Sequence, residues 1–395
     1  MSELSYLEKL MDGVEVEWKT LEDITLRTSN IKWREAIRSY RYIDLTSVDI
    51  ATKKIIETTE ITKNNAPSRA QKLVDENDVI FATTRPTQQR FCLIDSEYAG
   101  AVASTGYCIL RAKKDQVLPK WILHWISTSD FKKHVEENQS GSAYPAISDS
   151  KVKECLIPIP CPDNPEKSLA IQSEIVRILD TFTALTAELT AELNMRKKQY
   201  NYYRDQLLSF KEGEVEWKTL GEVAQFKRGT AITQKQTTPG EIPVVANGPI
   251  PTYFHSESNR QGETIVIARS GAYAGYVSFW DQPIFLTDAF SVHSDLKIVK
   301  PKFIYHVLQN KQEHIHAMKK GAGVPHVRVK EFETYDIPIP PITEQDRIVS
   351  ILDKFDTLTN SITEGLPREI ELRQKQYEYY RDLLFSFPKP ETVSN

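Results

Sequence analysis

The stretch EVEWKTL at residues 15–21 returns unchanged at residues 214–220, so the chain opens in the same way twice. Three further motifs return in the same order, namely IPIP at 157–160 and 337–340, IVRILD and IVSILD at 175–180 and 348–353, and QYNYYRD and QYEYYRD at 199–205 and 376–382. Between the motifs lie two long stretches, about residues 22–156 and 221–336, that scarcely resemble each other. A duplicated framework with different contents predicts a protein that holds two different recognition domains in a fixed mutual geometry.

The composition is typical of a globular protein with two or three domains. Of the 395 residues, 40% are hydrophobic and 26% are charged, and no apolar run is long enough to cross a bilayer. Residues 1–13 lack the apolar core of a signal peptide, and the four cysteines show no CxxC spacing, which together predict a reduced, cytosolic chain with buried thiols. The net charge of -4 does not indicate nucleic-acid binding, so any DNA contact must come from local patches or from partners that add positive charge.

Apolar residues spaced by three and four predict two long amphipathic helices, from about Glu166 to Phe210 and from about Thr343 to Phe387. Each helix would contain roughly 45 residues and be about 65 Å long at 1.5 Å per residue. A helix of this length needs another long helix to bury its apolar stripe. The two helices are therefore predicted to pack as an antiparallel coiled coil, and two separate helical hairpins are the alternative.

Tandem four-residue units lie in the middle of both predicted helices. In the first helix the unit TAEL occurs twice, as Thr186, Ala187, Glu188, Leu189, Thr190, Ala191, Glu192 and Leu193. Each unit adds about 6 Å of helix, so the repetition favours a spacer that sets length, and helix-forming filler is the alternative. In the second helix Gly365 and Pro367 fall among three looser units at residues 359–370 and are predicted to bend or break the helix.

The two dissimilar stretches show the same order of strand, helix and loop. Apolar and β-branched runs predict strands at residues 78–83 and 100–110 in the first stretch and at 264–269 and 279–292 in the second. Each stretch then contains one predicted helix and a loop of small residues, at 119–138 and 140–145 in the first and at 301–319 and 321–326 in the second. We therefore expect the two stretches to fold alike despite their different sequences.

Polar and basic side chains gather on the predicted loops of both stretches. Arg, Gln, Ser and Thr are the types that bond to base edges and phosphates, and glycine lets a backbone approach a phosphate closely. The candidate DNA-contacting residues are Thr83, Thr84, Arg85, Gln88, Gln89, Arg90, Ser142 and Tyr144 in the first stretch and Lys227, Arg228, Thr230, Arg269, Ser270, Tyr273, His326 and Arg328 in the second. Solvated turns without a binding role are the alternative, and the recurrence of such loops in both halves favours binding.

Signatures of catalysis are missing from the sequence. There is no GxxxxGK[ST] loop of the kind that binds the phosphates of ATP, and no strand–loop–helix that suggests a methyl-donor site. His314 and His316 form the tightest histidine pair, but no Cys, Asp or Glu spacing completes a metal-binding set around them. The sequence therefore predicts neither a catalytic site nor a metal site.

The chain resembles the specificity subunit of type I restriction–modification systems over essentially its whole length. The resemblance rests on the duplicated Trp-Lys-x-Leu opening, the IPIP motif followed by Glu344 and Gln345, the paired helices and the tandem TAEL units, which resemble those of the IC subgroup. The first helix departs from the pattern, because residues 163–169 form a longer lead-in in place of the usual Glu-Gln.

The resemblance implies an α+β fold: two mixed α/β target-recognition domains separated by a pair of long antiparallel helices, in a pseudo-twofold internal repeat. It implies that residues 1–13 close a ring, that 14–157 and 213–337 are the recognition domains, and that 158–212 and 338–395 are the spacer-helix regions. Each domain would read one half of a split double-stranded DNA site.

The resemblance also implies that this subunit is not catalytic and works in the bacterial cytoplasm. Two modification subunits would methylate adenine with S-adenosylmethionine, and two restriction subunits would translocate and cleave DNA with ATP and Mg, so all cofactors would belong to the partners. A coiled-coil scaffold whose globular ends bind proteins, without DNA specificity, is the alternative function.

Overall fold

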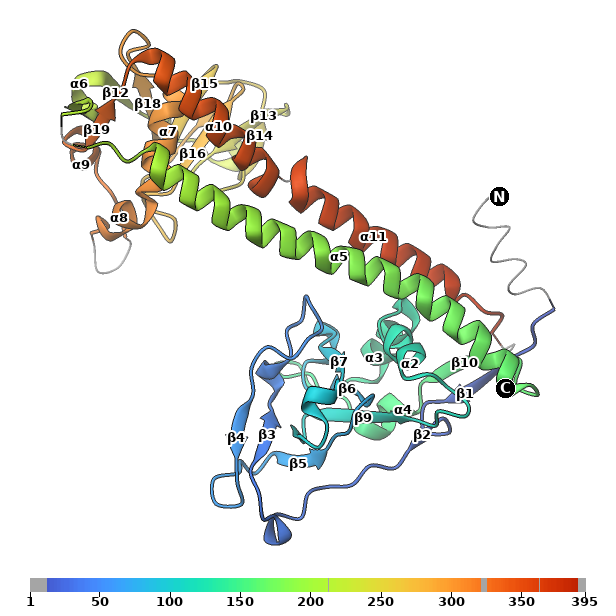
Figure 1. The fold of residues 1–395 in the computed structure, drawn as a ribbon. Helices are drawn as coiled ribbons and strands as arrows, with labels where there is room; N and C mark the ends of the chain where they lie inside the picture. Colours follow the sequence, from blue (N-terminus) through green and yellow to red (C-terminus); the bar gives the residue numbers. More distant parts are fainter. Residues whose placement is uncertain (1–12, 212, 321–324, 362, 390–395) are drawn as a thin grey trace. The chain divides into compact units, whose positions relative to one another are not determined.

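The computed structural model describes residues 13–211, 213–320, 325–361 and 363–389 (Figure 1). The chain divides into two compact units, Met1–Leu189 with Ile370–Asn395 and Thr190–Glu369. Each unit contains one of the dissimilar stretches together with parts of the long helices. Apart from Gly13, the segment 1–13 that was predicted to close a ring lies outside the described residues.

The first unit contains three small sheets. An antiparallel pair joins β1 and β10, one four-stranded sheet has the order β2-β9-β6-β7, and another has the order β4-β3-β8-β5. The strands are β1 (Val16–Thr20), β2 (Thr25–Leu26), β3 (Tyr40–Ile43), β4 (Thr59–Ile61), β5 (Ala70–Leu73), β6 (Val79–Ala82), β7 (Phe91–Leu93), β8 (Val102–Ser104), β9 (Tyr107–Ala112) and β10 (Leu156–Pro160). Short 3-10 helices lie between them, namely η1 (Trp33–Glu35), η2 (Leu45–Ser47), η3 (Pro86–Gln88) and η4 (Ser96–Tyr98).

The helices of the first unit correct one prediction. The single helix expected at residues 119–138 is two helices, α2 (Pro119–Trp125) and α3 (Ser129–Asn138), and α4 (Asp149–Lys153) follows. Thr128 causes the division, because its hydroxyl donates to the carbonyl of Trp125 at 2.7 Å and accepts the N–H of Phe131 at 3.2 Å. The same side chain thus binds the end of one helix and caps the start of the next.

The second unit repeats this arrangement with different residues. Its strands are β11 (Glu216–Thr219), β12 (Ala224–Arg228), β13 (Ile242–Val245), β14 (Tyr253–His255), β15 (Glu263–Ala268), β16 (Val277–Asp281), β17 (Phe285–Leu286), β18 (Ala289–Ser294) and β19 (Asp336–Ile339). Its short helices are α6 (Leu220–Val223), η5 (Gln234–Gln236), α7 (Pro301–Asn310), α8 (Gln312–Ala317) and α9 (Val329–Glu333). The single helix expected at residues 301–319 is again divided, here between α7 and α8.

The prediction that both stretches fold alike is confirmed by the strand order. The sheet β12-β18-β15-β16 corresponds to β2-β9-β6-β7, the sheet β14-β13-β17 corresponds to β4-β3-β8, and the pair β11-β19 corresponds to β1-β10. In the sheets β4-β3-β8-β5 and β14-β13-β17 the third strand is parallel to the second, β8 to β3 and β17 to β13. Strand β5 is the addition of the first unit.

Long helices contain the repeated motifs of residues 175–180, 199–205, 348–353 and 376–382. Helix α5 (Pro165–Leu207) is one continuous helix of 43 residues, and the TAEL units lie in its middle. The second long helix is broken as predicted, because α10 (Ile342–Asn360) ends before α11 (Gly365–Leu384) begins. Gly365 has a φ of +77°, and a Cβ there would lie 2.3 Å from the carbonyl oxygen of Thr357. In the first unit α5 packs antiparallel to α11, and in the second it packs antiparallel to α10 (Figure 1).

Each unit has its own main core, in which a short helix of the dissimilar stretch lies between a sheet and a long helix. In the first unit Trp121 and Ile122 of α2 share a core with Ile175 and Leu179 of α5. The end of the chain enters the same core, since Leu384, Phe385 and Phe387 belong to it. The indole N–H of Trp18 donates to the carbonyl of Pro388 at 2.7 Å, so the start and end of the described chain meet in this unit.

An aspartate on the long helix α5 binds side chains of α2 in the first unit. Asp180 of α5 accepts the Nε2–H of His124 at 3.0 Å and an N–H of the Lys120 ammonium at 2.6 Å. A carboxylate can only accept, so Nε2 of His124 carries a proton, and Nδ1 lies within hydrogen-bond distance of the Tyr377 hydroxyl, at 2.9 Å. Although burial alone would raise the pKa of Asp180, the bonds from His124 and Lys120 lower it below its ordinary value.

The second unit contains the same set of contacts. Asp353 of α10 accepts from Nε2 of His306 at 2.9 Å and from the Lys302 ammonium at 2.7 Å. Although burial alone would raise the pKa of Asp353, the bonds from His306 and Lys302 lower it below its ordinary value. We call each set of aspartate, histidine and lysine the helix anchor.

A glutamine eight residues before each aspartate completes the attachment. The side-chain oxygen of Gln172 accepts the backbone N–H of Leu118 at 2.9 Å, at the start of α2. Gln345 accepts the N–H of Lys300 at 2.8 Å, at the start of α7. The first N–H groups of a helix have no partner within the helix, so each glutamine binds an N–H that α2 or α7 leaves without a partner.

Three of the four cysteines are buried, and all four are free thiols. Burial raises the pKa of Cys92, of Cys108 and of Cys155 to about 12 in each case. Within the described residues, no helix has the length and apolar character needed to cross a membrane.

Alanine at Tyr203 or Tyr380 is expected to weaken folding or subunit assembly without changing recognised bases. Tyr203 stacks on Phe355 at 5.7 Å between ring centroids, and Tyr380 stacks on Phe182 at 5.4 Å. Losing such a pair costs about 0.5–1.5 kcal/mol beyond the lost burial. Chemical denaturation measures the loss of stability, and gel filtration of the complex measures the loss of subunit assembly. Altered bases with intact assembly would contradict the assignment.

The helix anchors are expected to make stability depend on pH. A carboxyl whose pKa is lowered by folding contributes stability that is present above its unfolded pKa and is lost as the pH falls through its folded pKa. The double variant Asp180→Asn, Asp353→Asn should therefore be less stable than the wild type at pH 7, by about 1.5–3 kcal/mol for each charged bond lost. The difference in unfolding free energy should shrink as the pH drops below about 4. A difference that stays constant with pH would contradict this account.

Candidate nucleic-acid interface

The structure brings together two loops of the first domain that the sequence analysis identified separately. The loop after β6 begins at Thr83, and the loop of small residues ends at Ile147. The N–H of Arg85 donates to the carbonyl of Pro145 at 2.7 Å, and the N–H of Ile147 donates to the carbonyl of Thr83 at 2.9 Å. The two predicted loops therefore form one surface at the end of strand β6.

The second domain pairs its loops in the same way. The N–H of Gly271 donates to the carbonyl of Pro325 at 2.9 Å, and the N–H of Val327 donates to the carbonyl of Arg269 at 3.0 Å. Arg269 thus takes the place of Thr83 of the first domain, and Gly271 takes the place of Arg85. Residues 321–324 of the second loop lie outside the described residues.

Left-handed backbone shapes the first loop. Arg85 and Gln89 have φ values of 50° and 53° and stand on either side of η3, in a region that residues other than glycine seldom adopt. The surroundings hold this conformation: the guanidinium of Arg90 donates to the carbonyls of Leu45 and Val48, and the Lys53 ammonium donates to the carbonyl of Gln89. Burial lowers the pKa of Lys53 to about 8. Strain of this kind gathers at functional sites.

The predicted residues of the first loop divide into exposed and buried groups. Arg85, Gln88, Ser142 and Tyr144 are exposed, and the guanidinium of Arg85 lies 5.2 Å from the ring centre of Tyr144. Thr84 and Gln89 are half-buried. Thr83 is buried and its hydroxyl donates to the carbonyl of Gly106 at 3.0 Å. Thr83 and Arg90 therefore hold the loop's conformation, and their bonded groups are not available to DNA.

A polar network fixes the second loop. The side-chain oxygen of Asn247 accepts the N–H groups of Arg269 and Ser270 at 2.9 and 3.2 Å. Asp288 accepts from the Asn247 amide at 2.5 Å and from the Ser270 hydroxyl at 2.9 Å, and its Oδ1 lies 3.2 Å from Nε of Arg269. Burial would raise the pKa of Asp288, but these two bonds and the charges of Arg269 and Arg228 lower it.

The other predicted residues of the second domain surround this network. Lys227 and Arg228 are exposed at the end of β12, and Thr230 is exposed just beyond it. Tyr273 and Arg328 are exposed, whereas Ser270 and His326 are half-buried. Positive charge is thus local to this loop end although the whole chain is slightly acidic.

Three contributors to the two loops were missed by the sequence analysis: Lys53, Asn247 and Asp288. Asn247 precedes Gly248 after an apolar run, a pair of residues typical of turns, so a turn could have been predicted there. Asp288 is the one acid within the apolar stretch 284–292. The side-chain contacts of these residues cross tens of sequence positions, and the patterns that predict single elements do not reveal them.

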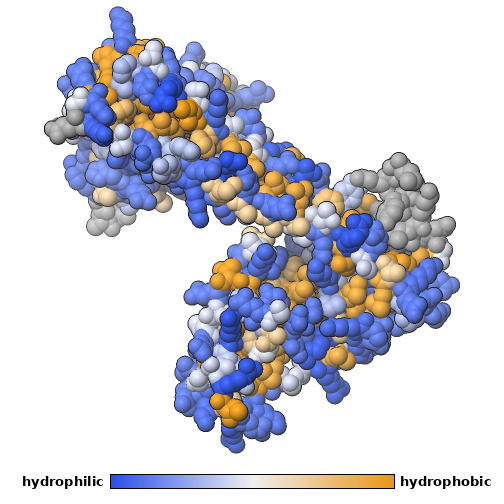
Figure 2. Space-filling view, in the orientation of Figure 1, coloured by the Kyte–Doolittle hydropathy of each residue, from blue (hydrophilic) through white to orange (hydrophobic). Residues whose placement is uncertain are grey.

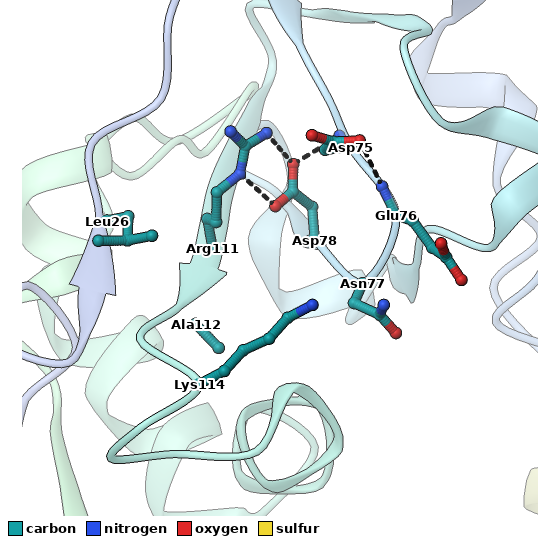
Figure 3. Close-up of a pocket in the computed structure, with 8 residues that line it drawn as sticks. All are labelled: Leu26, Asp75, Glu76, Asn77, Asp78, Arg111, Ala112 and Lys114. Carbon is teal, nitrogen blue, oxygen red and sulfur yellow. Dashed lines mark hydrogen bonds and ion pairs between the residues drawn. The ribbon is translucent and has the colours of Figure 1, made fainter.

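A cavity of about 340 Å³ in the first domain lies apart from the paired loops (Figure 3). Asp78 precedes β6 and Arg85 follows it, so the cavity and the loop surface lie at opposite ends of that strand. Arg111 and Asp78 bond to each other through both carboxylate oxygens, at 2.8 and 2.7 Å. The lining residues are Leu26, Asp75, Glu76, Asn77, Asp78, Arg111, Ala112 and Lys114. Because its central charges bind each other, we assign no function to this cavity.

Metal binding finds no support in the part of the chain that the structure describes, since no group of three or more His, Cys, Asp or Glu side chains is placed to hold an ion. His316 instead bonds through Nδ1 to the carbonyl of Ala274 at 3.2 Å. The side chains that converge on the loop ends are hydrogen-bond donors and acceptors suited to recognition.

Comparison with known proteins agrees with this organisation. A family model described as the type I restriction modification DNA specificity domain matches residues 14–196 and again residues 212–372. The specificity subunit of the type I restriction enzyme EcoR124I/EcoR124II from Escherichia coli is 45% identical over 427 aligned positions, which cover 100% of both chains. A putative specificity subunit from Haemophilus influenzae is 30% identical and covers 97% of this chain and 98% of its own.

Solved structures share the fold. The S subunit of a type I restriction–modification system from M. genitalium has a TM-score of 0.64 at 18% identity, covering 96% of this chain and 98% of its own. A chain from a structure concerned with complex assembly and conformational transition of the type I R-M system has a TM-score of 0.59 at 21% identity, covering 94% and 97%. With the specificity domain matched twice and a full-length relative at 45% identity, the chain belongs to the family of type I restriction–modification specificity subunits, which recognise DNA sequence and are not enzymes.

Proposed function

We propose that each recognition domain reads one half of a bipartite DNA site and that the long helices set the gap between the halves. One observation carries this proposal: both domains pair the same two loops at the same strand ends, through the same backbone bonds, while the side chains there differ. A scaffold would have no need to keep this loop pairing while varying every polar residue on it. Two domains with the same fold but different loop side chains suit a DNA site whose two halves differ in sequence.

The distribution of charged side chains supports DNA contact through the paired loops of each domain. Arg85 and Tyr144 in the first domain, and Arg228 and Arg269 in the second, provide donors for phosphates and base edges. The net charge of -4 is too low to supply strong nonspecific binding, since that depends on neutralising many phosphates. Partner subunits would therefore supply much of the phosphate contact.

The partners follow from the same proposal. Two modification subunits would dock on the long helices, and two restriction subunits would join them, in the bacterial cytoplasm. Large apolar side chains remain exposed on these helices, with Leu372 and Tyr379 in the first unit and Met195 and Tyr202 in the second. Apolar patches also interrupt the hydrophilic surface visible in Figure 2. S-adenosylmethionine, ATP and Mg would bind the partners, and this chain would hold no cofactor.

The proposal is tested by mapping methylated adenines in cells that carry this chain with its modification subunits. A bipartite site with two unlike halves and a fixed gap is expected. The double variant Arg85→Ala, Arg269→Ala is the control, since it should lower methylation at the same sites. An assembled complex that methylates without sequence preference would contradict the proposal and favour the scaffold alternative.

Adding one TAEL unit after Leu193 is expected to lengthen the gap by one or two base pairs. The unit adds about 6 Å of helix, whereas DNA rises about 3.4 Å per base pair, and the helix need not run parallel to the DNA. The bases of both half-sites should stay the same, because neither loop surface is altered. Methylation mapping measures the gap, and deletion of residues 190–193 should shorten it. An active insertion variant with the original gap would contradict the spacer role.

Arg85→Ala is expected to weaken methylation through the first half-site. If Arg85 bonds to a base, the loss is about 1–3 kcal/mol and one position becomes relaxed. If Arg85 bonds to a phosphate, the affinity for all DNA sequences falls alike, and binding becomes less dependent on salt. Lys133→Ala removes a charge of the same sign from an exposed position of α3 and should have little effect. Unchanged binding in the Arg85 variant would remove this loop from the interface.

A further inference from the structure

We infer that Arg269 reads a guanine in the second half-site and that Asp288 is the positioning residue that aims it. The inference rests on the proposed function, because it assigns a base to a domain proposed to read DNA. It goes further by giving the chemical identity of one recognised base and by naming the side chain that selects it.

The backbone of Arg269 is fixed on both sides. Its N–H donates to the side chain of Asn247 at 2.9 Å, and its carbonyl accepts the N–H of Val327 at 3.0 Å. The residue directly follows β15, whose residues from Thr264 to Ala268 are buried. The Cα of Arg269 is therefore held by a rigid strand end, which is the placement that precise recognition requires.

Asp288 orients the Arg269 side chain, while the terminal nitrogens of the guanidinium stay available for a ligand. Nε of Arg269 lies 3.2 Å from Oδ1 of Asp288, and the Arg269 side chain is 42% exposed. Asp288 itself is fixed, because its Oδ2 accepts from Asn247 at 2.5 Å and from Ser270 at 2.9 Å. Neither terminal nitrogen of Arg269 donates a hydrogen bond to any residue that the structure describes.

Another arginine–aspartate pair of this chain shows what a purely structural pair looks like. Arg111 uses both Nε and a terminal nitrogen on Asp78, at 2.8 and 2.7 Å, and the Asp78 side chain is only 1% exposed. The guanidinium donors of Arg111 that face Asp78 are thus both bonded within the protein. The Arg269 pair differs, because Nε is the nitrogen closest to the Asp288 carboxylate, and the two terminal nitrogens have no hydrogen-bond partner among the described residues.

The chemistry of the open end selects guanine. Two parallel N–H donors match the two acceptors N7 and O6 on the major-groove edge of guanine, whereas adenine and cytosine present a donor amine and thymine offers a single acceptor with a methyl group. A phosphate is disfavoured, because the Asp288 carboxylate beside the guanidinium would repel it. A neutral base edge meets no such repulsion.

The first domain lacks this arrangement. Thr83 stands where Arg269 stands in the second domain, and its hydroxyl is used by Gly106. Arg85 lies two residues further along and stacks over Tyr144 without a carboxylate partner. The assignment of guanine therefore applies to the second half-site alone, and the first half-site serves as an internal control.

The test uses the complex of this chain with its modification subunits and DNA duplexes that carry single base changes. Arg269→Ala should lower the preference for one G·C pair of the second half-site by about 5- to 150-fold, and leave first half-site preferences unchanged. Lys235→Ala, which removes a charge from exposed η5, is the matched control and should change neither half-site. Equal weakening for every sequence would mean a phosphate contact and would overturn the inference.

Replacing the guanine by 7-deazaguanine makes the test specific, because this base lacks the N7 acceptor. The replacement should weaken binding by the wild-type complex and have little further effect on Arg269→Ala, so the two losses should not add. Asp288→Asn should also lose the preference at this same pair and become less sensitive to the replaced base. Additive losses, or an Asp288→Asn variant that keeps full preference, would overturn the inference.

Failure of the inference and failure of the proposed function give different results. A wild-type complex that recognises a bipartite site without a G·C pair in its second half, or whose Arg269→Ala variant keeps the guanine, overturns the guanine assignment alone. A wild-type complex without any sequence preference overturns the proposed function. Methylation at the first half-site position confirms that each variant has folded and assembled.

Discussion

Each recognition domain is attached to its long helix by a small, partly buried set of polar contacts centred on a buried histidine, and the rest of the structure depends on this attachment. Asp180 holds His124 and Lys120 in the first unit, and Asp353 holds His306 and Lys302 in the second. Charged hydrogen bonds in partly buried surroundings are stronger than neutral ones and tolerate little misplacement. Because the helix anchors use side chains of α2 and α7 and none from the paired loops, the loops at the ends of the strands can vary without disturbing the anchors.

The variation at those loops takes two different physical forms. The first domain holds its loop by left-handed backbone at Arg85, supported from behind by Lys53 and Arg90. The second domain holds its loop by the side-chain network around Asn247 and Asp288. Both solutions fix the loop against the same strand ends and the same neighbouring loop. A common frame can therefore present readers of different chemistry, and this explains why the framework repeats while the sequence between its motifs does not.

The repeated motifs and apolar spacings were enough to predict the internal repeat, the long helices and the break at Gly365, because each depends on local patterns. The fold class followed from the resemblance to a known family. The division of residues 119–138 was missed, since the side chain of Thr128 overrides a helical pattern that continues through it. The candidate loops were found by composition, but their pairing depends on backbone bonds across more than fifty positions, such as that from Arg85 to Pro145. The roles of Thr83 and Asp288 likewise follow from tertiary contacts that no pattern in the sequence reveals.

The central claim is that the frame positions readers whose own residues determine what is recognised. It is tested most directly by replacing residues 221–336 with a copy of residues 22–156, assembling the chain with its modification subunits and mapping the methylated adenines. The account predicts a site in which both halves carry the bases of the original first half-site. Assembly with the original second half-site retained would contradict it, because the frame and the helices would then contribute to the choice of bases.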